Sequence, residues 1–376
     1  MRIAVISRVF SKAGGGAESY SVALVQQLAA RHDIHVFAQE SNHPVNGVTY
    51  HTVFCLSRKP RWINQLLFAI ATWIKTRSGF EVVHSHENTW HGQIQTVHVR
   101  PLRYNLFVLH SGIRWLLQWI KVILSPRLLT YIWLEGARFR RSLGRKIVAT
   151  SDGLRTECER AYPLSTPALS VITPGTYLPL SLPSQETARQ QLGVPSNGRL
   201  VLFVANDYVR KGLDALLQAI VQLPADVGLI VVGNAKQAPK YRQQAERLGL
   251  ATRVHFLGSL HDLSPAYAAA DCLAHPTLED SFAMVVLEAM AHGLPVVVSG
   301  PAQCGISRQL TDGTAALLLT DPKDAKKLSE CIGAVLDQPE LAEQLRRQGR
   351  AFAQAHSWES VALQYESLYQ QAACRN

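Results

Sequence analysis

The chain has 376 residues, of which 47% are hydrophobic and 18% are charged, and its formal net charge is +10. This length and apolar content favour two domains with well-filled cores. The six cysteines are scattered, with neither a C-x-x-C pair nor His/Cys pairs at zinc-binding spacing, and are interpreted as reduced thiols of a cytoplasmic protein. The apolar run that opens the sequence is too short for a signal peptide.

The positive charge is concentrated in the first half of the chain. Residues 1–175 contain 21 Lys and Arg against 9 Asp and Glu, a net charge of +12, whereas residues 176–376 contain 17 against 19, a net charge of −2. Within the first half, residues 100–146 hold ten basic residues and one acid, Glu135. This asymmetry indicates that the first half faces something anionic.

The first predicted elements are a strand, a glycine loop and a helix. Arg2–Ile6 is an apolar run typical of a parallel strand, residues 14–16 are three glycines, and a helical pattern follows to Ala30. In this arrangement the backbone can approach a phosphate or a sugar closely. The spacing fits neither G-x-G-x-x-G nor the P-loop, so the glycines alone are weak support for a ligand site.

Short apolar runs predict further strands in the first half, and the apolar stretch Trp62–Ile74 predicts a helix. The strands are expected at 34–38, 48–54, 81–84, 94–98 and 146–150. The run 94–98 ends in His98. A lone histidine after a strand is more often structural than catalytic, but ligands of α/β sheets bind at the carboxyl ends of strands, so His98 is a candidate site residue.

The basic segment 100–146 contains an amphipathic stretch, Ile113–Leu124, in which Trp115 and Trp119 are interleaved with cations. It is too short and too charged to span a bilayer, which requires about 20 apolar residues. Two interpretations remain open: core helices with solvated basic ends, or a surface that lies on anionic lipid with its aromatic rings among the headgroups. In the second interpretation, the cations expected to contribute include Arg138, Arg140 and Arg141.

Five prolines between residues 163 and 183 indicate an interdomain crossover. After it, six apolar runs alternate with helical stretches, which predicts a doubly wound parallel sheet. The runs lie at 200–205, 228–232, 253–257, 272–274, 295–298 and 315–319. The expected domains are 1–175 and 176–355, followed by an amphipathic helix within 356–376.

Two adjacent cations follow the first strand of the second half. Arg210 and Lys211 precede Gly212 on a strand-to-helix turn. A guanidinium fork beside a compact ammonium charge suits a diphosphate. A solvated charge pair is the alternative, because an R-K-G triplet alone is not specific.

The stretch 275–298 predicts a polar loop, a helix and a buried strand. The helix covers Met284–His292 and ends at Gly293. Asp280 precedes this helix and Glu288 lies inside it, and the N–H groups at the helix start are able to hold an anion. An acidic first turn and an incidental buried glutamate form the structural alternative. A buried acid in an apolar helix is costly without a partner, which favours a ligand contact.

This stretch resembles the nucleotide-sugar motif of the retaining GT-B glycosyltransferases of family 4, which runs E-x-F-G-x-x-x-x-E-A-M-A-x-G-x-P-V-V. Glu288 matches the second Glu, whereas Asp280 stands at the first Glu and Ala283 at the Gly. The R-K-G triplet also matches the family, and so do the T-x-H at 96–98 and a G-G-x-E loop formed by Gly15, Gly16 and Glu18. At residues 173–177, where family members carry an N-P-G-x-D turn, this chain has neither the Asn nor the Asp. The resemblance covers most of the chain and is strongest at 199–300.

The resemblance implies an α/β GT-B fold, with two Rossmann-like doubly wound parallel-sheet domains that face a cleft and a terminal helix that crosses back to the first domain. Glu288 is expected to bind the ribose and Asp280 the donor sugar, while Arg210 and Lys211 neutralise the leaving diphosphate. The remaining contacts implied are Gly15 and Gly16 on the donor phosphate, Glu18 on the acceptor, His98 beside the donor sugar, and the amides of Phe282, Ala283 and Met284 on sugar and phosphate.

The pattern is most similar to bacterial enzymes that build the lipopolysaccharide core. This implies transfer of a hexosyl unit, with retention, from a UDP-linked sugar to a phosphate-rich glycolipid or a saccharide at the inner face of the cytoplasmic membrane. A peripheral protein on an anionic membrane surface is therefore expected. The nucleotide sugar is a substrate, and no cofactor is expected. A metal ion is not expected at the diphosphate, because the chain has no D-x-D triplet.

Two other classes of protein are compatible with parts of the sequence. The basic composition permits a nucleic-acid binder, but the sequence contains no recognisable aromatic–basic module, so no nucleic acid is expected as a partner. A GT-B protein that binds a nucleotide sugar without transferring it, either as an inactive partner subunit or as a sugar-nucleotide epimerase, is the remaining alternative.

Overall fold

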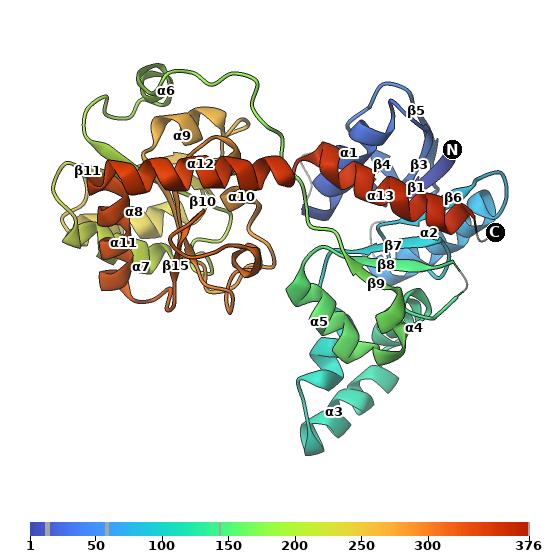
Figure 1. Ribbon diagram of the computed structural model, residues 1–376. Coiled ribbons are helices and arrows are strands. Elements are labelled where there is room, and N and C mark those ends of the chain that lie inside the picture. Colours follow the sequence, from blue (N-terminus) through green and yellow to red (C-terminus); the bar gives the residue numbers. More distant parts are fainter. Residues whose placement is uncertain (12–15, 57–59, 143, 375–376) are drawn as a thin grey trace. The chain divides into compact units, whose positions relative to one another are not determined.

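The computed structural model describes residues 1–11, 16–56, 60–142 and 144–374, and these residues form two compact units (Figure 1). Unit 1 consists of Met1–Pro174 together with Trp358–Asn376, and unit 2 consists of Gly175–Ser357. Each unit is a parallel β-sheet covered by helices, as in a Rossmann-like domain.

The sheet of unit 1 has seven strands within the described residues, in the order β5-β3-β1-β6-β7-β8-β9, and all neighbours are parallel. The chain order reverses between β1 and β6, as in a doubly wound sheet. The strands are β1 (Arg2–Ile6), β3 (Asp33–Ala38), β5 (Val48–Thr52), β6 (Val82–Ser85), β7 (Ile94–Val97), β8 (Lys146–Ala149) and β9 (Leu169–Val171), and β2 (Val9–Phe10) pairs separately with β4 (Glu40–Ser41).

Alternate residues of β1 enter different cores of unit 1. Ile3 and Val5 pack with helices α1 and α13, whereas Ala4 and Ile6 pack with helix α2, as expected for a strand buried on both faces. The helical elements of unit 1 are α1 (Gly16–Leu28), α2 (Arg61–Thr76), the π-helix η1 (Tyr104–Val108), α3 (Gly112–Ile123), α4 (Pro126–Arg138), α5 (Asp152–Ala161), the 3-10 helix η2 (Pro163–Ala168) and α13 (Trp358–Ala373).

The sheet of unit 2 has six described parallel strands in the order β12-β11-β10-β13-β14-β15. The strands are β10 (Arg199–Ala205), β11 (Val227–Gly233), β12 (Val254–Gly258), β13 (Cys272–His275), β14 (Val296–Ser299) and β15 (Leu317–Leu319). The helices are α6 (Gln185–Leu192), α7 (Leu213–Gln222), α8 (Ala238–Arg247), α9 (Ser264–Ala269), α10 (Met284–Ala291), the 3-10 helix η3 (Ile306–Gln309), α11 (Ala325–Asp337) and α12 (Pro339–Ala355).

Two apolar layers cover the sheet of unit 2. Leu200, Leu202 and Val204 of β10 pack on one side with α9 and α10, and Val201 and Phe203 pack on the other side with α7, α8 and α11. The alternation explains why β10 is a nearly continuous apolar run in the sequence.

The two predicted parallel sheets are confirmed, and every strand expected in either half has its counterpart. The proline-rich segment 163–183, interpreted as an interdomain crossover, contains the boundary between the two units, at Pro174 and Gly175. Its first part also forms η2 and then β9, a strand that the sequence did not predict and that pairs with β8. Pro163 and Pro167 lie within η2, before the strand begins, so the prolines do not break its hydrogen bonds.

None of the helices in the described part of the chain is both long and apolar enough to cross a membrane.

Candidate functional site

The R-K-G turn of unit 2 lies at the carboxyl end of β10 and leads into α7. Gly212 has a φ of +80°, and a Cβ atom at this position would lie 2.0 Å from the carbonyl oxygen of Pro276. Glycine is therefore required both by the backbone conformation and by the close approach of the loop after β13. The carbonyl of Arg210 accepts hydrogen bonds from the amide of Leu278 (2.8 Å) and the hydroxyl of Thr277 (3.3 Å), which hold the two loops together.

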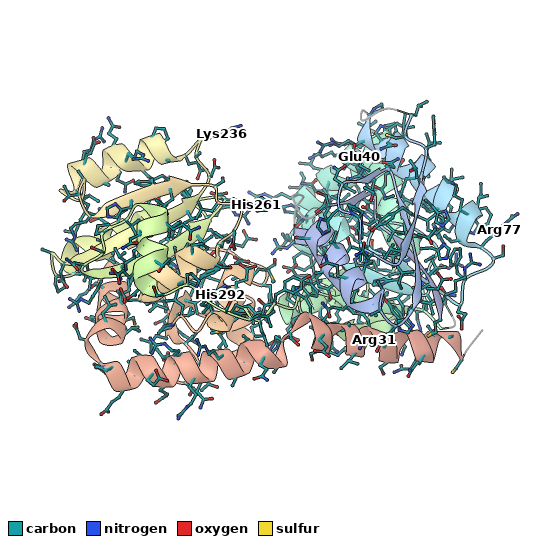
Figure 2. All side chains as sticks on the ribbon, turned by 90° about the horizontal axis from the view of Figure 1, so that it is seen from above. Arg31, Glu40, Arg77, Lys236, His261 and His292 are labelled. Atoms are coloured by element: carbon teal, nitrogen blue, oxygen red, sulfur yellow. The ribbon has the colours of Figure 1, made fainter. Side chains whose placement is uncertain are left out.

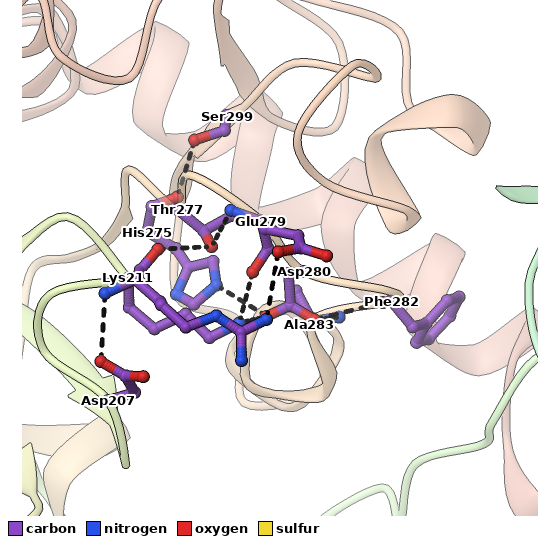
Figure 3. Close-up of polar contacts among 10 residues, drawn as sticks. Asp207, Lys211, His275, Thr277, Glu279, Asp280, Phe282, Ala283 and Ser299 are labelled. Atoms are coloured by element: carbon purple, nitrogen blue, oxygen red, sulfur yellow. Dashed lines mark hydrogen bonds and ion pairs between the residues drawn. The ribbon is translucent and has the colours of Figure 1, made fainter. Parts of the chain in front are cut away.

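Asp280 joins these two loops through its side chain (Figure 3). Its Oδ2 accepts from Lys211 Nζ at 2.6 Å and from His275 Nε2 at 3.2 Å. Its Oδ1 accepts from the amides of Phe282 (3.2 Å) and Ala283 (2.8 Å), immediately before α10. Four donors thus converge on one carboxylate, whose side chain is only 15% exposed.

The surroundings of Asp280 favour its ionised form. Burial disfavours the charge, but the hydrogen bond from His275 and the positive charge of Lys211 outweigh it, so the pKa of Asp280 lies well below its usual value. Burial lowers the pKa of His275 more than Asp280 raises it. His275 is therefore neutral with its proton on Nε2, and its buried Nδ1 has no hydrogen-bond partner among the described residues.

Arg210 lies at the edge of this cluster. Its guanidinium is 3.3 Å from the carboxylate of Glu279, and both side chains are more than half exposed. Its amide donates to Asp207 Oδ1 at 3.1 Å. The exposed guanidinium is therefore accessible to a ligand, whereas Lys211, 20% exposed, also donates to the carbonyl of Glu279 at 3.0 Å.

Glu288 lies on the second turn of α10, in a largely apolar helix. The hydroxyl of Tyr267 donates to its Oε2 at 2.8 Å. Burial raises the pKa of Glu288, and the hydrogen bond from Tyr267 opposes this shift. The partner that a buried acid requires is thus supplied in part by a tyrosine of α9.

Both ends of α10 have left-handed backbone. Ala283, at the N-cap, has a φ of +66° and is the one non-glycine residue of the described chain with positive φ. Gly293 follows the helix with a φ of +73°, which confirms the predicted glycine C-terminus. The position at which the family pattern carries glycine therefore does require a left-handed conformation, and alanine occupies it here at a cost of about 1–2 kcal/mol.

In unit 1, His98 follows β7 and lies beside His86, which follows β6. The Nε2 of His98 is 2.9 Å from the Nδ1 of His86, and their rings are stacked. The fully buried His84 bonds to the hydroxyls of Tyr369 and Thr96, both at 2.7 Å. Burial lowers the pKa of all three histidines, to about 3 for His86, and nearby Arg138 lowers it further. The three rings are therefore neutral.

The position of Arg138 corrects one expectation. Its side chain was expected to face a membrane with Arg140 and Arg141, but it is only 4% exposed and donates to Asn88 Oδ1 at 2.9 Å and to the carbonyl of Thr96. Arg140 and Arg141 are exposed.

Glu18, the candidate acceptor contact, lies in the first turn of α1 and is half-buried. Gly16 begins this helix, whereas Gly15 lies outside the described residues.

Three residues of the candidate sites were not predicted from the sequence: His275, Tyr267 and His86. The sequence did contain a signal for His86 as a site residue, because it follows a predicted strand, as His98 does.

No group of three His, Cys, Asp or Glu side chains that could hold a metal ion occurs in the described parts of the chain.

Comparison with known proteins covers nearly the whole chain. Residues 14–178 match the family "Glycosyltransferase Family 4", and residues 184–352 match "Glycosyl transferases group 1". Lipopolysaccharide glucosyltransferase WaaG of Escherichia coli is 30% identical over 239 residues, which are 61% of this chain and 63% of that protein. The chain thus spans less than two thirds of the length of this relative.

Solved structures show the same fold. The crystal structure of WaaG, a glycosyltransferase involved in lipopolysaccharide biosynthesis, has a TM-score of 0.77 at 22% identity and covers 98% of this chain and 99% of its own. Anabaena HepE in complex with UDP-glucose has a TM-score of 0.71 at 20% identity, over 98% of this chain and 100% of its own. With two parallel-sheet units, two matching glycosyltransferase domains and this similarity to WaaG, the chain belongs to the family 4 glycosyltransferases of the GT-B fold.

Proposed function

We propose that this protein is a retaining glycosyltransferase that moves a hexosyl unit from a UDP-linked sugar to a glycolipid or saccharide acceptor of the lipopolysaccharide-core type. The observation that carries the proposal is the cluster of Lys211, Asp280 and His275 at the carboxyl ends of β10 and β13. Ligands of open α/β sheets bind at such strand ends.

The donor site lies in unit 2. Arg210 and Lys211 neutralise the charge that grows on the leaving diphosphate, and Glu288 binds the ribose hydroxyls of the nucleotide. Asp280, fixed by four donors, holds Lys211 and the start of α10 in place and contacts the donor sugar. The complex of HepE with UDP-glucose, a protein of the same fold, supports a uridine nucleotide as the carrier.

Transfer proceeds with retention of the anomeric configuration. The acceptor hydroxyl attacks from the side of the leaving group, and an oxygen of the departing β-phosphate takes its proton. No side chain of the protein has to act as the base in this step. In unit 1, the candidate residue His98 is buried, neutral and bonded to His86.

The acceptor is presented at an anionic membrane surface, on which the protein is peripheral and cytoplasmic. The name of the relative WaaG, a lipopolysaccharide glucosyltransferase, supports a glycolipid acceptor. Helix α3 supports the membrane contact. Of its residues only Val122 is buried, whereas Ile113, Leu116, Leu117 and Ile123 are each more than half exposed. Trp115 and Trp119, 43% and 37% exposed, pack on Phe107 beside them.

Product analysis tests this function. The protein is incubated with UDP-glucose or UDP-galactose labelled in the sugar, with and without a lipopolysaccharide-core acceptor. Label in the acceptor, joined with the donor's anomeric configuration, is expected. Release of an epimerised UDP-sugar, or binding of the nucleotide sugar without any product, would replace the proposal with the epimerase or the inactive partner.

A further inference from the structure

Helix α2 of unit 1 buries polar residues beside apolar ones and exposes apolar residues to solvent. Its buried side contains Phe68 and Ala69 and also the polar residues Asn64, Gln65, Thr72 and Thr76. Its exposed side carries Ile70, Trp73 and Ile74, which are 37%, 41% and 52% exposed. An amphipathic helix of a soluble domain normally turns its apolar stripe to the core.

The buried polar groups of α2 are satisfied inside the protein. The amides of Asn64 and Gln39 exchange two hydrogen bonds of 2.9 and 2.8 Å, and Gln65 donates to the carbonyl of Asn88 at 3.2 Å. Thr72 and Thr76 donate to carbonyls one turn back along the helix, at 2.8 Å each. The bonds of Asn64 to Gln39 and of Gln65 to Asn88 reach other elements and fix the rotation of α2, so the apolar residues cannot turn inward without breaking them. Those of Thr72 and Thr76 lie within the helix and satisfy its buried hydroxyls.

The exposed side of α2 continues into α4 through three tryptophans. The ring of Trp73 lies 6.4 Å from that of Trp90, which lies 5.7 Å from that of Trp133 on α4. Trp133 is 56% exposed, and Leu129, one turn earlier on α4, is 44% exposed. We name the surface formed by Ile70, Trp73, Ile74, Leu129 and Trp133 the tryptophan face.

The charges near the tryptophan face are positive. Helices α2, α3 and α4 contain one carboxylate, Glu135, which is 5% exposed and accepts hydrogen bonds from the amides of Leu102 and Arg103 and the hydroxyl of Tyr162. None of the three helices therefore presents a negative charge to solvent. The exposed cations at the ends of α2 and α4 include Arg61, Lys75, Arg77, Arg140 and Arg141, and Arg77 projects outward from the unit (Figure 2).

We propose that the tryptophan face is a second lipid-contacting surface, which lies on anionic phospholipid together with the exposed side of α3. Tryptophans favour the headgroup region, and aliphatic residues between them enter the acyl boundary. Surrounding cations add an attraction to anionic lipid that salt screens. A contact through α3 alone would leave unit 1 free to rotate about one short helix. Two contact surfaces on the same unit would fix how the unit is oriented on the membrane. This inference rests on the membrane contact in the proposed function.

Vesicle sedimentation with three matched double variants tests the inference. Trp73→Ser with Ile74→Ser alters the tryptophan face, and Leu116→Ser with Leu117→Ser alters α3. The control variant, Val221→Ser with Leu363→Ser, removes apolar residues of similar exposure elsewhere. On vesicles of phosphatidylglycerol and phosphatidylcholine at low salt, the first two variants are each expected to bind at least about fivefold more weakly than the control variant. Vesicles of phosphatidylcholine alone are expected to bind little of any protein.

The possible outcomes separate the inference from the proposed function. If the α3 variant loses binding while the α2 variant binds as the control does, the tryptophan face is not a lipid contact and the proposed function stands. If the wild-type protein does not sediment with anionic vesicles, both membrane contacts fail, and sugar transfer to a water-soluble core oligosaccharide still tests the enzyme. A wild-type dimer in sedimentation velocity that Trp73→Ser with Ile74→Ser converts to monomer would overturn the inference in favour of a second copy of the chain. Circular dichroism of each variant confirms folding.

Discussion

Nζ of Lys211 lies 2.6 Å from Oδ2 of Asp280, and this ion pair joins two loops whose residues are 69 positions apart in the sequence. Both side chains are largely buried, and His275 and two backbone amides complete the set of donors around the carboxylate. A diphosphate bound at Arg210 and Lys211 would therefore meet a lysine that is already held in position.

Lys211→Met is expected to lower kcat about ten- to a hundredfold while it changes KM for the donor less. The variant loses a charge-assisted bond of about 1.5–3 kcal/mol to the leaving group, whose charge is greatest in the transition state. Steady-state kinetics with a labelled UDP-sugar measures this, and Lys236→Ala, which removes an exposed lysine elsewhere on unit 2 (Figure 2), is the control. Equal kinetics of the two variants would show that Lys211 only supports the loop.

Glu288→Gln is expected to weaken binding of the UDP-sugar by about 1.5–3 kcal/mol for each charge-assisted bond lost to the ribose. Isothermal titration calorimetry measures the change. Tyr267→Phe removes the internal hydrogen bond to Glu288 without removing its charge, and is expected to reduce affinity less. An unchanged affinity of the Glu288→Gln variant for the UDP-sugar would contradict the assignment of this residue to the nucleotide.

Substitutions of Ala283 are expected to separate backbone strain from packing. Ala283→Gly relieves about 1–2 kcal/mol of left-handed strain, but it loses a buried methyl worth about 0.8 kcal/mol and adds up to about 1 kcal/mol of unfolded-state entropy. Its free energy of unfolding is therefore expected to change by less than about 1 kcal/mol. Ala283→Val, with a β-branched side chain at φ +66°, is expected to lose at least about 2 kcal/mol. Chemical denaturation measures both, and a neutral valine variant would contradict this account.

Stability is expected to fall as pH falls from 7.5 to 5.5, because the unfolded chain takes up protons that the buried histidines cannot. For His86, with a pKa of about 3 in the folded protein against about 6.5 unfolded, the loss is about 1.4 kcal/mol per pH unit below 6.5. His84 and His98 act in the same direction. The depressed pKa of Asp280 matters only at lower pH, since its contribution is present above the unfolded value of about 3.9.

Urea unfolding at the two pH values measures this loss, and His86→Asn is expected to make the pH dependence shallower. An equal free energy of unfolding at pH 7.5 and 5.5 would mean that the three rings are not held neutral.

Transfer is expected to continue in EDTA, because Arg210, Lys211 and helix amides are assigned to the diphosphate in place of a divalent cation. The test is the transfer assay with EDTA, then with added Mg²⁺ or Mn²⁺. Activity that stops with the chelator and returns with the metal would show that the diphosphate site has been wrongly assigned.

The sequence determined the local features of this protein. Apolar runs of three to seven residues between helical stretches predicted the parallel strands, because a strand buried on both faces has to be apolar throughout. The positions of Gly212 and Gly293 predicted a tight turn and a helix end, and both have positive φ. The motif at 275–298 placed Asp280 before α10 and Glu288 inside it, and the structure has them there.

Only the tertiary structure decided which distant groups meet. Tyr267 carries no local signal for its bond to Glu288, because that bond depends on how α9 packs against α10. His275 lies only five residues before Asp280, but their contact depends on how the loop after β13 folds back. The sequence predicts that Arg138 is a surface cation. Its burial is possible because it donates hydrogen bonds to Asn88 and Thr96, which lie more than forty residues earlier in the chain. The orientation of α2 could not be predicted from the sequence either. Its composition shows that the helix is apolar, but its hydrogen-bond partners on other elements determine which side faces solvent.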